Sequence, residues 1–305
     1  MRRVLFADGQ DDRVLAAVVE LGRRDVRPVV FDDPQRTLAT ATRLGLSLEG
    51  IEVLDTLPER AAVATKIAAQ RGVEPWLVDR LLDRPIYGAL AMLATGAVDA
   101  LVAGATSHTS DVLVACEMCL GFRAGSTTPS STFVMDIPGL SRLVFADCAV
   151  NPEPTFEQLA EIAIAAADTA PVVLGEPARV AMLSFSTHGS AHHPAVDKIA
   201  KATALVRERR PDIVIDGELQ ADAALDPASA ARKLDDGAVA GNANVLVFPD
   251  LGAGNIGYKL VRSLAKAKAY GALLHGYTKP VVKLSRGATT DEIIGSAKAL
   301  VALAR

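Results

Sequence analysis

A serine, an arginine and a glutamate near the end of the chain have the types and spacing that suit phosphate chemistry. Ser285 and Arg286 stand just before a segment with helical spacing, so a hydroxyl, a forked guanidinium and the N–H groups of a helix N-terminus would meet there. Glu292 follows Ser285 by about two helical turns and could reach the same space as a general base. Structural roles stay open: Arg286 could form a salt bridge to another domain, and Glu292 could complement the helix dipole.

A second candidate anion site lies in residues 242–260, NANVLVFPDLGAGNIGYKL. The pattern predicts a buried strand, then a glycine loop at residues 250–255, then a helix that opens at Asn255. In parallel sheets, ligands bind where strand ends meet helix N-termini. Gly254 would let backbone N–H groups approach an anion, and Lys259 adds a positive charge one turn past Asn255. The alternative is a tight strand-to-helix turn with a solvated lysine.

Three further strand ends are rich in small polar residues, at residues 104–111, 185–191 and 216–222. Ser110 or Asp111 has the alternative role of a helix cap. Because these strand ends lack a metal-binding cluster of His and Asp, we expect them to bind phosphate or another oxyanion through neutral donors and a few cations. The candidate substrate-binding residues are Thr106, Ser107, Thr109, Ser186, Thr187, Gly189, Ser190, Gly254, Asn255 and Lys259.

Cysteine and histidine spacings argue against a metal site. Cys116 and Cys119 have redox or zinc spacing, but no second pair accompanies them and the surrounding segment is apolar, so we expect buried thiols. His188, His192 and His193 could bind zinc, although no Cys or carboxylate is placed to complete the site, which favours a solvated loop. The first strand ends in acidic and amide residues where a dinucleotide fingerprint has glycines, and no Walker or Gly-x-Ser-x-Gly sequence occurs.

Composition predicts an α/β protein. The chain has 305 residues, of which 50% are hydrophobic and only 4% aromatic, as expected for parallel α/β layers rather than a β-sandwich. A net charge of −4 without a basic cluster argues against nucleic acid as a partner. Three cysteines, the absence of a signal peptide and the absence of a membrane-length apolar run predict a cytoplasmic protein that does not enter a membrane.

The order of predicted elements indicates two domains with an active cleft between them. The chain opens with a strand, a helix over residues 12–23 and a second strand, which is a βαβ unit. A hairpin over residues 131–146 interrupts the βα repeats and marks a second domain. Other expected helices are one over residues 76–93 that is broken or kinked near Pro85, one that a capping box at residues 155–158 begins, and one that runs from Asn255 to Tyr270. A last helix over residues 290–305 is long enough to return to the first domain. We therefore expect domain I at 1–129 plus 284–305, and domain II at 130–283.

Five motifs resemble the phosphate acetyltransferase family. They are MLSFSTHGSA (182–191), DGELQADAAL (216–225), ANVLVFPDLGAGNIGYKL (243–260), KPVVKLSRG (279–287) and FADCAVNPEPTFEQLAEIAI (145–164). The resemblance implies two three-layer α/β/α domains related to the isocitrate dehydrogenase-like fold, and a homodimer. It also implies transfer of an acetyl group between coenzyme A and inorganic phosphate, with coenzyme A as a substrate and no metal or nucleotide cofactor.

The resemblance assigns roles to three residues. Arg286 matches the arginine that holds the phosphate, and Ser285 matches the serine that hydrogen-bonds the developing tetrahedral centre. Glu292 stands where the family usually has an aspartate that takes the proton of the coenzyme A thiol. We therefore expect a phosphate acyltransferase, with acetyl as the expected acyl group, that acts on acyl-CoA, phosphate and acyl phosphate.

Departures from the family pattern keep two alternatives open. Val114 and Ala68 replace family cations by apolar side chains, and Lys283 stands where an acidic residue is usual. One alternative is a catalytically impaired, regulatory relative of the family that binds acyl-CoA. The other is an acyltransferase for another short-chain acyl group.

Overall fold

The computed structural model describes residues 2–22 and 26–304. Its internal contacts divide the chain into two compact units. Unit 1 comprises Met1–Gly125 and Tyr277–Arg305, and unit 2 comprises Ser126–Gly276. Two helix ends expected from the sequence, at Arg23 and Arg305, lie outside the described residues.

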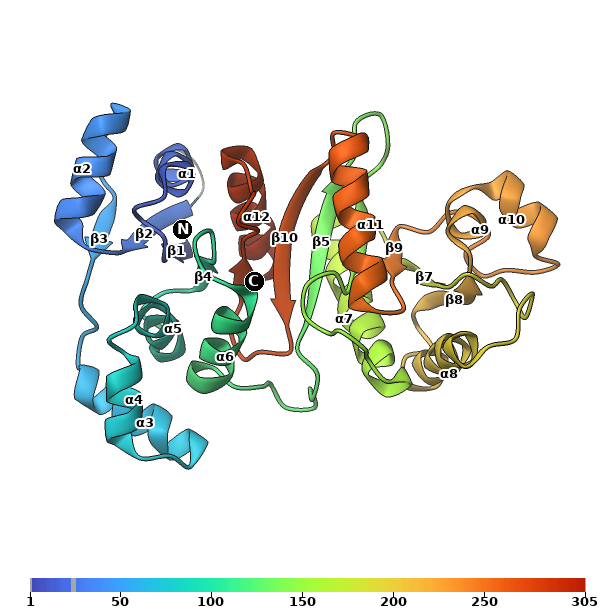
Figure 1. The fold of residues 1–305 in the computed structure, drawn as a ribbon, viewed down its shortest axis with the longest axis horizontal. Helices are drawn as coiled ribbons and strands as arrows, with labels where there is room; N and C mark the ends of the chain where they lie inside the picture. Colours follow the sequence, from blue (N-terminus) through green and yellow to red (C-terminus); the bar gives the residue numbers. More distant parts are fainter. Residues whose placement is uncertain (1, 23–25, 305) are drawn as a thin grey trace. The chain divides into compact units, whose positions relative to one another are not determined.

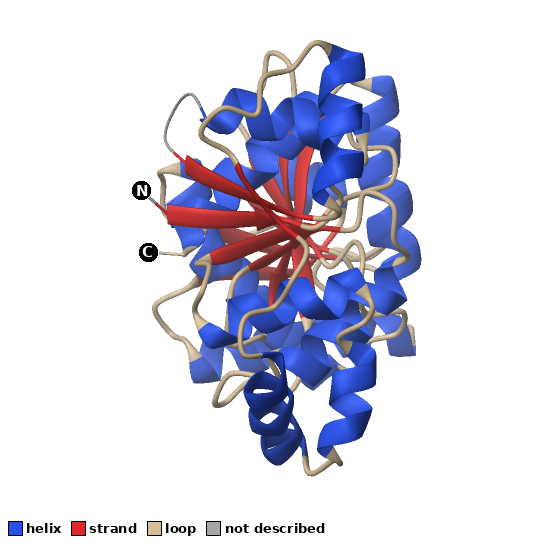
Figure 2. Cartoon of the chain, turned by 90° about the vertical axis from the view of Figure 1, so that its left-hand side faces the viewer, coloured by secondary structure: helices blue, strands red, loops and turns tan. Residues whose placement is uncertain are grey.

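In the described part of unit 1, parallel strands form one sheet in the order β3-β2-β1-β4-β11. Helices α1 and α12 cover one face, and α5 and α6 cover the other (Figure 1). Figure 2 shows helices on both sides of the strands. The elements of unit 1 are β1 Arg2–Phe6, α1 Asp12–Gly22, β2 Val26–Phe31, α2 Pro34–Leu44, β3 Glu52–Leu54, α3 Arg60–Arg71, α4 Pro75–Leu81, α5 Pro85–Thr95, β4 Ala100–Ala103, α6 Thr109–Cys119, β11 Val281–Lys283 and α12 Thr290–Leu303.

The central strands of unit 1 are buried on both faces. Leu5 and Phe6 of β1, Leu101 of β4 and Val281 of β11 are all fully buried. A parallel sheet covered on both faces needs continuous apolar strands, and these sequences supply them. The carboxyl ends of β1, β4 and β11 therefore meet at one edge of a rigid sheet.

Unit 2 has a mixed sheet in the order β10-β5-β6-β9-β7-β8. The pairs β10–β5 and β5–β6 are antiparallel, and the remaining pairs are parallel. Helices α7 and α8 lie on one face and α11 on the other (Figure 1). The elements of unit 2 are β5 Ser130–Asp136, β6 Leu143–Ala146, α7 Phe156–Leu174, β7 Arg179–Leu183, α8 Pro194–Arg209, β8 Val214–Leu219, α9 Ala221–Leu225, α10 Pro227–Lys233, β9 Val245–Val247, α11 Leu251–Leu264 and β10 Lys268–His275.

Helix α7 forms the centre of the core of unit 2. It begins with a capping box between Thr155 and Gln158, as the sequence predicts. A stripe of buried alanines along the helix, including Ala163 and Ala166, packs in one cluster with Met182 of β7. Small residues at helical spacing let this helix lie close to the sheet.

Several local predictions are confirmed. Strands β5 and β6 form the expected antiparallel hairpin. The helical segment that the sequence interrupts near Pro85 is two helices, α4 and α5, with Pro85 at the start of the second. The α/β fold class is confirmed, and no helix among the described residues is both long and apolar enough to cross a membrane.

Other local predictions are wrong. The glycine loop expected at residues 250–255 does not form, because α11 begins at Leu251 with Asp250 as its N-cap. The polar strand end expected at residues 216–222 begins later, because β8 continues to Leu219. The helix expected to reach Tyr270 ends at Leu264, and Tyr270 lies in β10.

The expected domain boundaries near residues 129 and 283 differ from the boundaries of the compact units. β11, assigned to domain II from the sequence, pairs in parallel with β4 and belongs to unit 1. This pairing explains the difference, because it extends the sheet of unit 1. The cleft between the domains stays a prediction.

Candidate active site

The loops after β4 and β11 lie at the same edge of the sheet of unit 1. Lys283 pairs with Ala103 in the parallel register, and the backbone N–H of Leu284 donates to the Ala103 carbonyl at 2.7 Å. Thr106 and Ser107 follow one strand, and Ser285 and Arg286 follow the other. The fold therefore brings together two groups of candidate residues that are far apart in the sequence.

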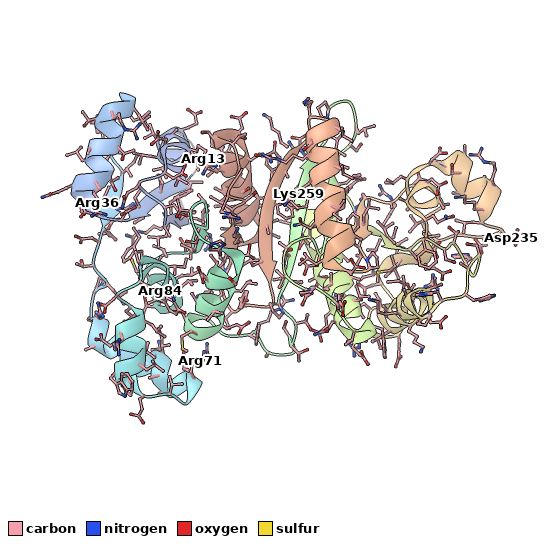
Figure 3. All side chains as sticks on the ribbon, in the orientation of Figure 1. Arg13, Arg36, Arg71, Arg84, Asp235 and Lys259 are labelled. Carbon is pink, nitrogen blue, oxygen red and sulfur yellow. The ribbon has the colours of Figure 1, made fainter. Side chains whose placement is uncertain are left out.

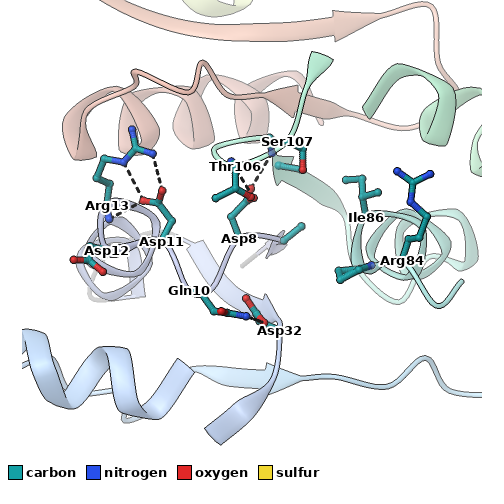
Figure 4. Close-up of a pocket in the computed structure, with 14 residues that line it drawn as sticks. Asp8, Gln10, Asp11, Asp12, Arg13, Asp32, Arg84, Ile86, Thr106 and Ser107 are labelled. Carbon is teal, nitrogen blue, oxygen red and sulfur yellow. Dashed lines mark hydrogen bonds and ion pairs between the residues drawn. The ribbon is translucent and has the colours of Figure 1, made fainter. Parts of the chain in front are cut away.

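Asp8, which follows β1, fixes the loop after β4. Its carboxylate is buried and accepts hydrogen bonds from the backbone N–H groups of Gly104 at 2.8 Å, Ala105 at 3.1 Å and Thr106 at 3.3 Å. The Thr106 hydroxyl also donates to Asp8 (Figure 4). The sequence indicates only an acidic loop here, and Asp8 is a site residue that sequence reasoning missed.

Replacing Asp8 by alanine is expected to lower the free energy of unfolding by roughly 3 kcal/mol, because each buried donor left unsatisfied costs about 1–3 kcal/mol. Urea unfolding followed by circular dichroism measures the change. Asp12→Ala is the matched control, since Asp12 and its partner Arg43 are both exposed. Equal effects of the two substitutions would show that the Asp8 hydrogen bonds do not hold this loop.

Hydrogen bonds to backbone groups order the Ser285–Arg286 turn. Arg13 Nη1 donates to the carbonyl of Arg286 at 2.7 Å and to that of Ala288 at 2.9 Å. The Ser285 hydroxyl accepts a long hydrogen bond from the Gly287 N–H at 3.3 Å. The guanidinium of Arg286 is exposed, and no ion pair to it occurs within residues 2–22 and 26–304. It is therefore available to bind an anion.

Glu292 lies in a capping box at the start of α12. Its Oε2 accepts from the Thr289 N–H at 2.8 Å, and the Thr289 hydroxyl accepts from the Glu292 N–H at 3.3 Å. The side chain is buried. The capping role is therefore present in the structure, and the role of Glu292 as a general base stays a prediction.

A cavity of about 750 Å³ lies at the carboxyl ends of β1, β2 and β4. Thr106 and Ser107 line it together with Asp8, and Arg13 and Arg84 supply positive charge at its wall (Figure 4). The cavity can admit a small polar ligand to the candidate loop of β4. It lies entirely within unit 1.

Helix α6 begins at Thr109, with His108 as its N-cap residue, so neither Ser110 nor Asp111 caps it. Val114 lies on this helix and is 56% exposed, whereas Ala68 is fully buried in α3. An arginine at position 114 would therefore reach solvent without repacking the core, but one at position 68 would not.

In unit 2, the loop after β7 uses most of its hydroxyls internally. Glu218, buried in β8, accepts from the Ser186 hydroxyl at 3.0 Å and from the Gly189 N–H at 2.7 Å. The Thr187 hydroxyl accepts from the Gln220 N–H at 3.0 Å. Ser186 and Thr187 therefore build the loop, while Gly189 and Ser190 remain exposed on it.

Helix α11 places its candidate residues differently from the expected loop. Gly254 lies in the helix, where a Cβ would overlap the carbonyl of Asp147, so this glycine permits close packing on the backbone after β6. The Asn255 amide donates to the Cys148 carbonyl at 3.0 Å. Lys259 is exposed, with its ammonium 6.0 Å from the centre of the Tyr258 ring (Figure 3). Gly254 and Asn255 therefore hold α11 against the backbone that follows β6, whereas Lys259 faces solvent.

The cysteines and histidines have structural surroundings. Cys116 and Cys119 are buried, as predicted, and burial raises the pKa of both thiols. His188 Nε2 lies 3.1 Å from Asp216 Oδ1, and His193 Nδ1 accepts from the Ala195 N–H. Within the described ranges, no group of three or more His, Cys, Asp and Glu side chains is arranged to hold a metal ion.

Comparisons with known proteins agree with the resemblance seen in the motifs. The model of the family described as phosphate acetyl/butaryl transferase matches residues 1–302. The phosphate acetyltransferase of Clostridium acetobutylicum is 40% identical over 306 residues, covering 96% of this chain and 91% of that protein. The solved phosphotransacetylase of Streptococcus pyogenes has a TM-score of 0.90 at 35% identity, covering 99% of this chain and 94% of that one. The solved EutD phosphotransacetylase of Staphylococcus aureus has a TM-score of 0.89 at 34% identity, covering 100% and 94%.

Proposed function

The chain belongs to the phosphate acetyl/butaryl transferase family, and from this premise we propose that it interconverts acetyl-CoA and phosphate with acetyl phosphate and coenzyme A. The chain is thus an acyltransferase. The observation that carries the proposal is the exposed guanidinium of Arg286 in an ordered turn, at the sheet edge that also presents Thr106 and Ser107. Such a preorganised cation beside hydroxyls and N–H donors suits a phosphoryl group.

The proposed reaction is an acyl transfer. Glu292 takes the proton of the coenzyme A thiol, and the thiolate attacks the carbonyl carbon of acetyl phosphate. A carbon–sulfur bond forms, the carbon–oxygen bond to the phosphate breaks, and the electron pair leaves with the phosphate. Arg286 stabilises the departing phosphate, and Ser285 donates a hydrogen bond to the developing oxyanion.

We propose Thr106, Ser107 and Thr109 of unit 1 as further substrate contacts. Within unit 2, Gly189, Ser190 and Lys259 are exposed and stay predicted substrate-binding residues. Coenzyme A is a substrate, and no resident cofactor is proposed. A cytoplasmic location stays part of the proposal, supported by the small number of cysteines.

The test is thioester formation by the purified protein from coenzyme A and acetyl, propionyl or butyryl phosphate. Activity that is highest with acetyl phosphate supports the proposal, and another preference would identify a different short-chain acyl group. A correctly folded protein that is inactive with all three would overturn it. The alternative of a non-catalytic regulatory relative gains no support, because the similar proteins above are named as enzymes.

We also propose a homodimer. Ile256, Leu260 and Leu264 are spaced by four residues on α11 and are 61%, 52% and 79% exposed, which forms an apolar stripe on the surface of unit 2. A second copy of the chain is the proposed partner of this stripe.

Substituting Leu260→Asp and Leu264→Asp together is expected to raise the dimer dissociation constant by roughly a hundredfold or more, because central apolar anchors contribute about 2 kcal/mol each to such interfaces. Light scattering coupled to size-exclusion chromatography measures the mass. Leu38→Asp is the control, since Leu38 is an exposed leucine, at 59%, on α2 of unit 1, whereas the stripe belongs to unit 2. A double variant that remains dimeric would exclude the stripe from the interface.

A further inference from the structure

Lys283, the last residue of β11, is a buried cation beside the candidate active site. It stands two residues before Ser285 and is only 7% exposed. Its stem runs across Gly104 of the neighbouring loop, where a Cβ would lie 3.1 Å from Lys283 Cε and 3.3 Å from Cγ. Gly104 has a φ of +96°, so the glycine both allows this backbone and leaves room for the lysine.

The ammonium of Lys283 has no hydrogen-bond or salt-bridge partner within the parts of the chain that the structure describes. The carboxylate whose charge acts on it is Asp8, but the Asp8 oxygens accept from the loop at Gly104 and Thr106 instead. Burial lowers the pKa of Lys283, the charge of Arg286 lowers it further, and Asp8 acts in the opposite direction.

These charges do not balance. The charges that act on the Lys283 ammonium come from the cation Arg286 and the carboxylate Asp8, which makes two cations, Lys283 included, to one carboxylate. The other nearby arginine, Arg13, is already paired with Asp11 at 2.6 Å. A mostly buried cation without a partner is costly, and such groups concentrate at functional sites, so this edge suits an anion.

We propose that Lys283 is a phosphate-binding residue that, with Arg286, holds the phosphate or phosphoryl group of the substrate. This inference rests on the proposed function and adds a second cation to it. A dianion placed between the two cations would neutralise both and supply acceptors for the three ammonium donors. Because the stem of Lys283 is already buried against Gly104, little side-chain freedom remains to be lost on binding.

The experiment measures binding of inorganic phosphate by calorimetry, and the KM for phosphate and for acetyl-CoA separately. Lys283→Met is expected to raise the Kd and the KM for phosphate by about ten- to a hundredfold, the value of one charged hydrogen bond, and to leave the KM for acetyl-CoA unchanged. Lys279→Met is the matched control, because Lys279 is exposed just before the start of β11. It should bind phosphate like the wild type.

Lys283→Gln keeps hydrogen-bond donors but loses the charge. It tests the role of Lys283 in phosphate binding if Lys283→Met folds poorly. Weakened phosphate binding in this variant supports a charge-based role. Wild-type phosphate affinity in a folded Lys283 variant would overturn the inference and leave the proposed function intact. An equal loss of phosphate affinity in Lys279→Met would also overturn the inference. So would a wild-type protein that binds no phosphate, whether or not it transfers acetyl groups.

Discussion

Replacing Arg286 by alanine is expected to lower kcat/KM for acetyl phosphate by about 10²–10³-fold, the loss that follows removal of one preorganised oxyanion donor. The guanidinium makes no ion pair in the described residues, so the substitution removes the proposed phosphate contact and no structural ion pair among those residues. The turn itself should persist, because Arg13 binds the carbonyl of residue 286, which alanine keeps.

The thioester assay and a thermal unfolding curve together test this expectation. Arg286→Lys should recover only part of the loss, because an ammonium cannot pair two phosphate oxygens in the planar fork of a guanidinium. Arg36→Ala is the control, since Arg36 is an exposed arginine on α2. Unchanged kcat/KM in a stable Arg286→Ala protein would remove Arg286 from the phosphate site, and a large drop in stability would show a structural role.

The parts of the fold that local chemistry determines could be predicted from the sequence. The continuous apolar runs of β1 and β4 required a parallel sheet covered on both faces, and Pro85 required a new helix. The capping box at Thr155 marked the start of α7. In each case the preference of the segment itself and the final structure agree.

The parts that depend on distant neighbours could not be predicted. Two glycines between a strand and a helix look like a loop, but Gly254 is helical, and its missing Cβ lets the backbone of Asp147, more than a hundred positions earlier in the chain, pack against it. The burial of Lys283 likewise depends on Gly104, which reaches it only through the pairing of β4 with β11. The sequence pattern of one segment does not identify such distant partners.

The candidate site also has features that the sequence predicts and features that it does not. The hydroxyls of Ser186 and Thr187 were expected to bind substrate, and their position at a strand end was inferred correctly. Their partners, Glu218 and Gln220, lie in and after β8, and the hydrogen bonds between the two segments appear only in the folded chain. The residue types and their positions at a strand end could therefore be predicted from the sequence, but the direction of each side chain could not.

Replacing Glu292 by glutamine is expected to lower kcat by about 10²–10⁴-fold, the usual contribution of a general base. Glutamine is also accepted in a capping box, so the hydrogen bond to Thr289 N–H should remain and α12 should stay folded. The lost attraction between a carboxylate and the helix N-terminus is expected to cost about 0.3–1 kcal/mol of stability. The substitution therefore separates the chemical role of Glu292 from its structural role.

Kinetics and urea unfolding of Glu292→Gln should accordingly diverge, with a large fall in kcat and a small change in stability. Asp291→Asn makes the same change of charge at the exposed neighbouring position and should leave kcat unaltered. Full activity of Glu292→Gln would mean that Glu292 only caps α12, and the base would have to be sought elsewhere at this edge of unit 1.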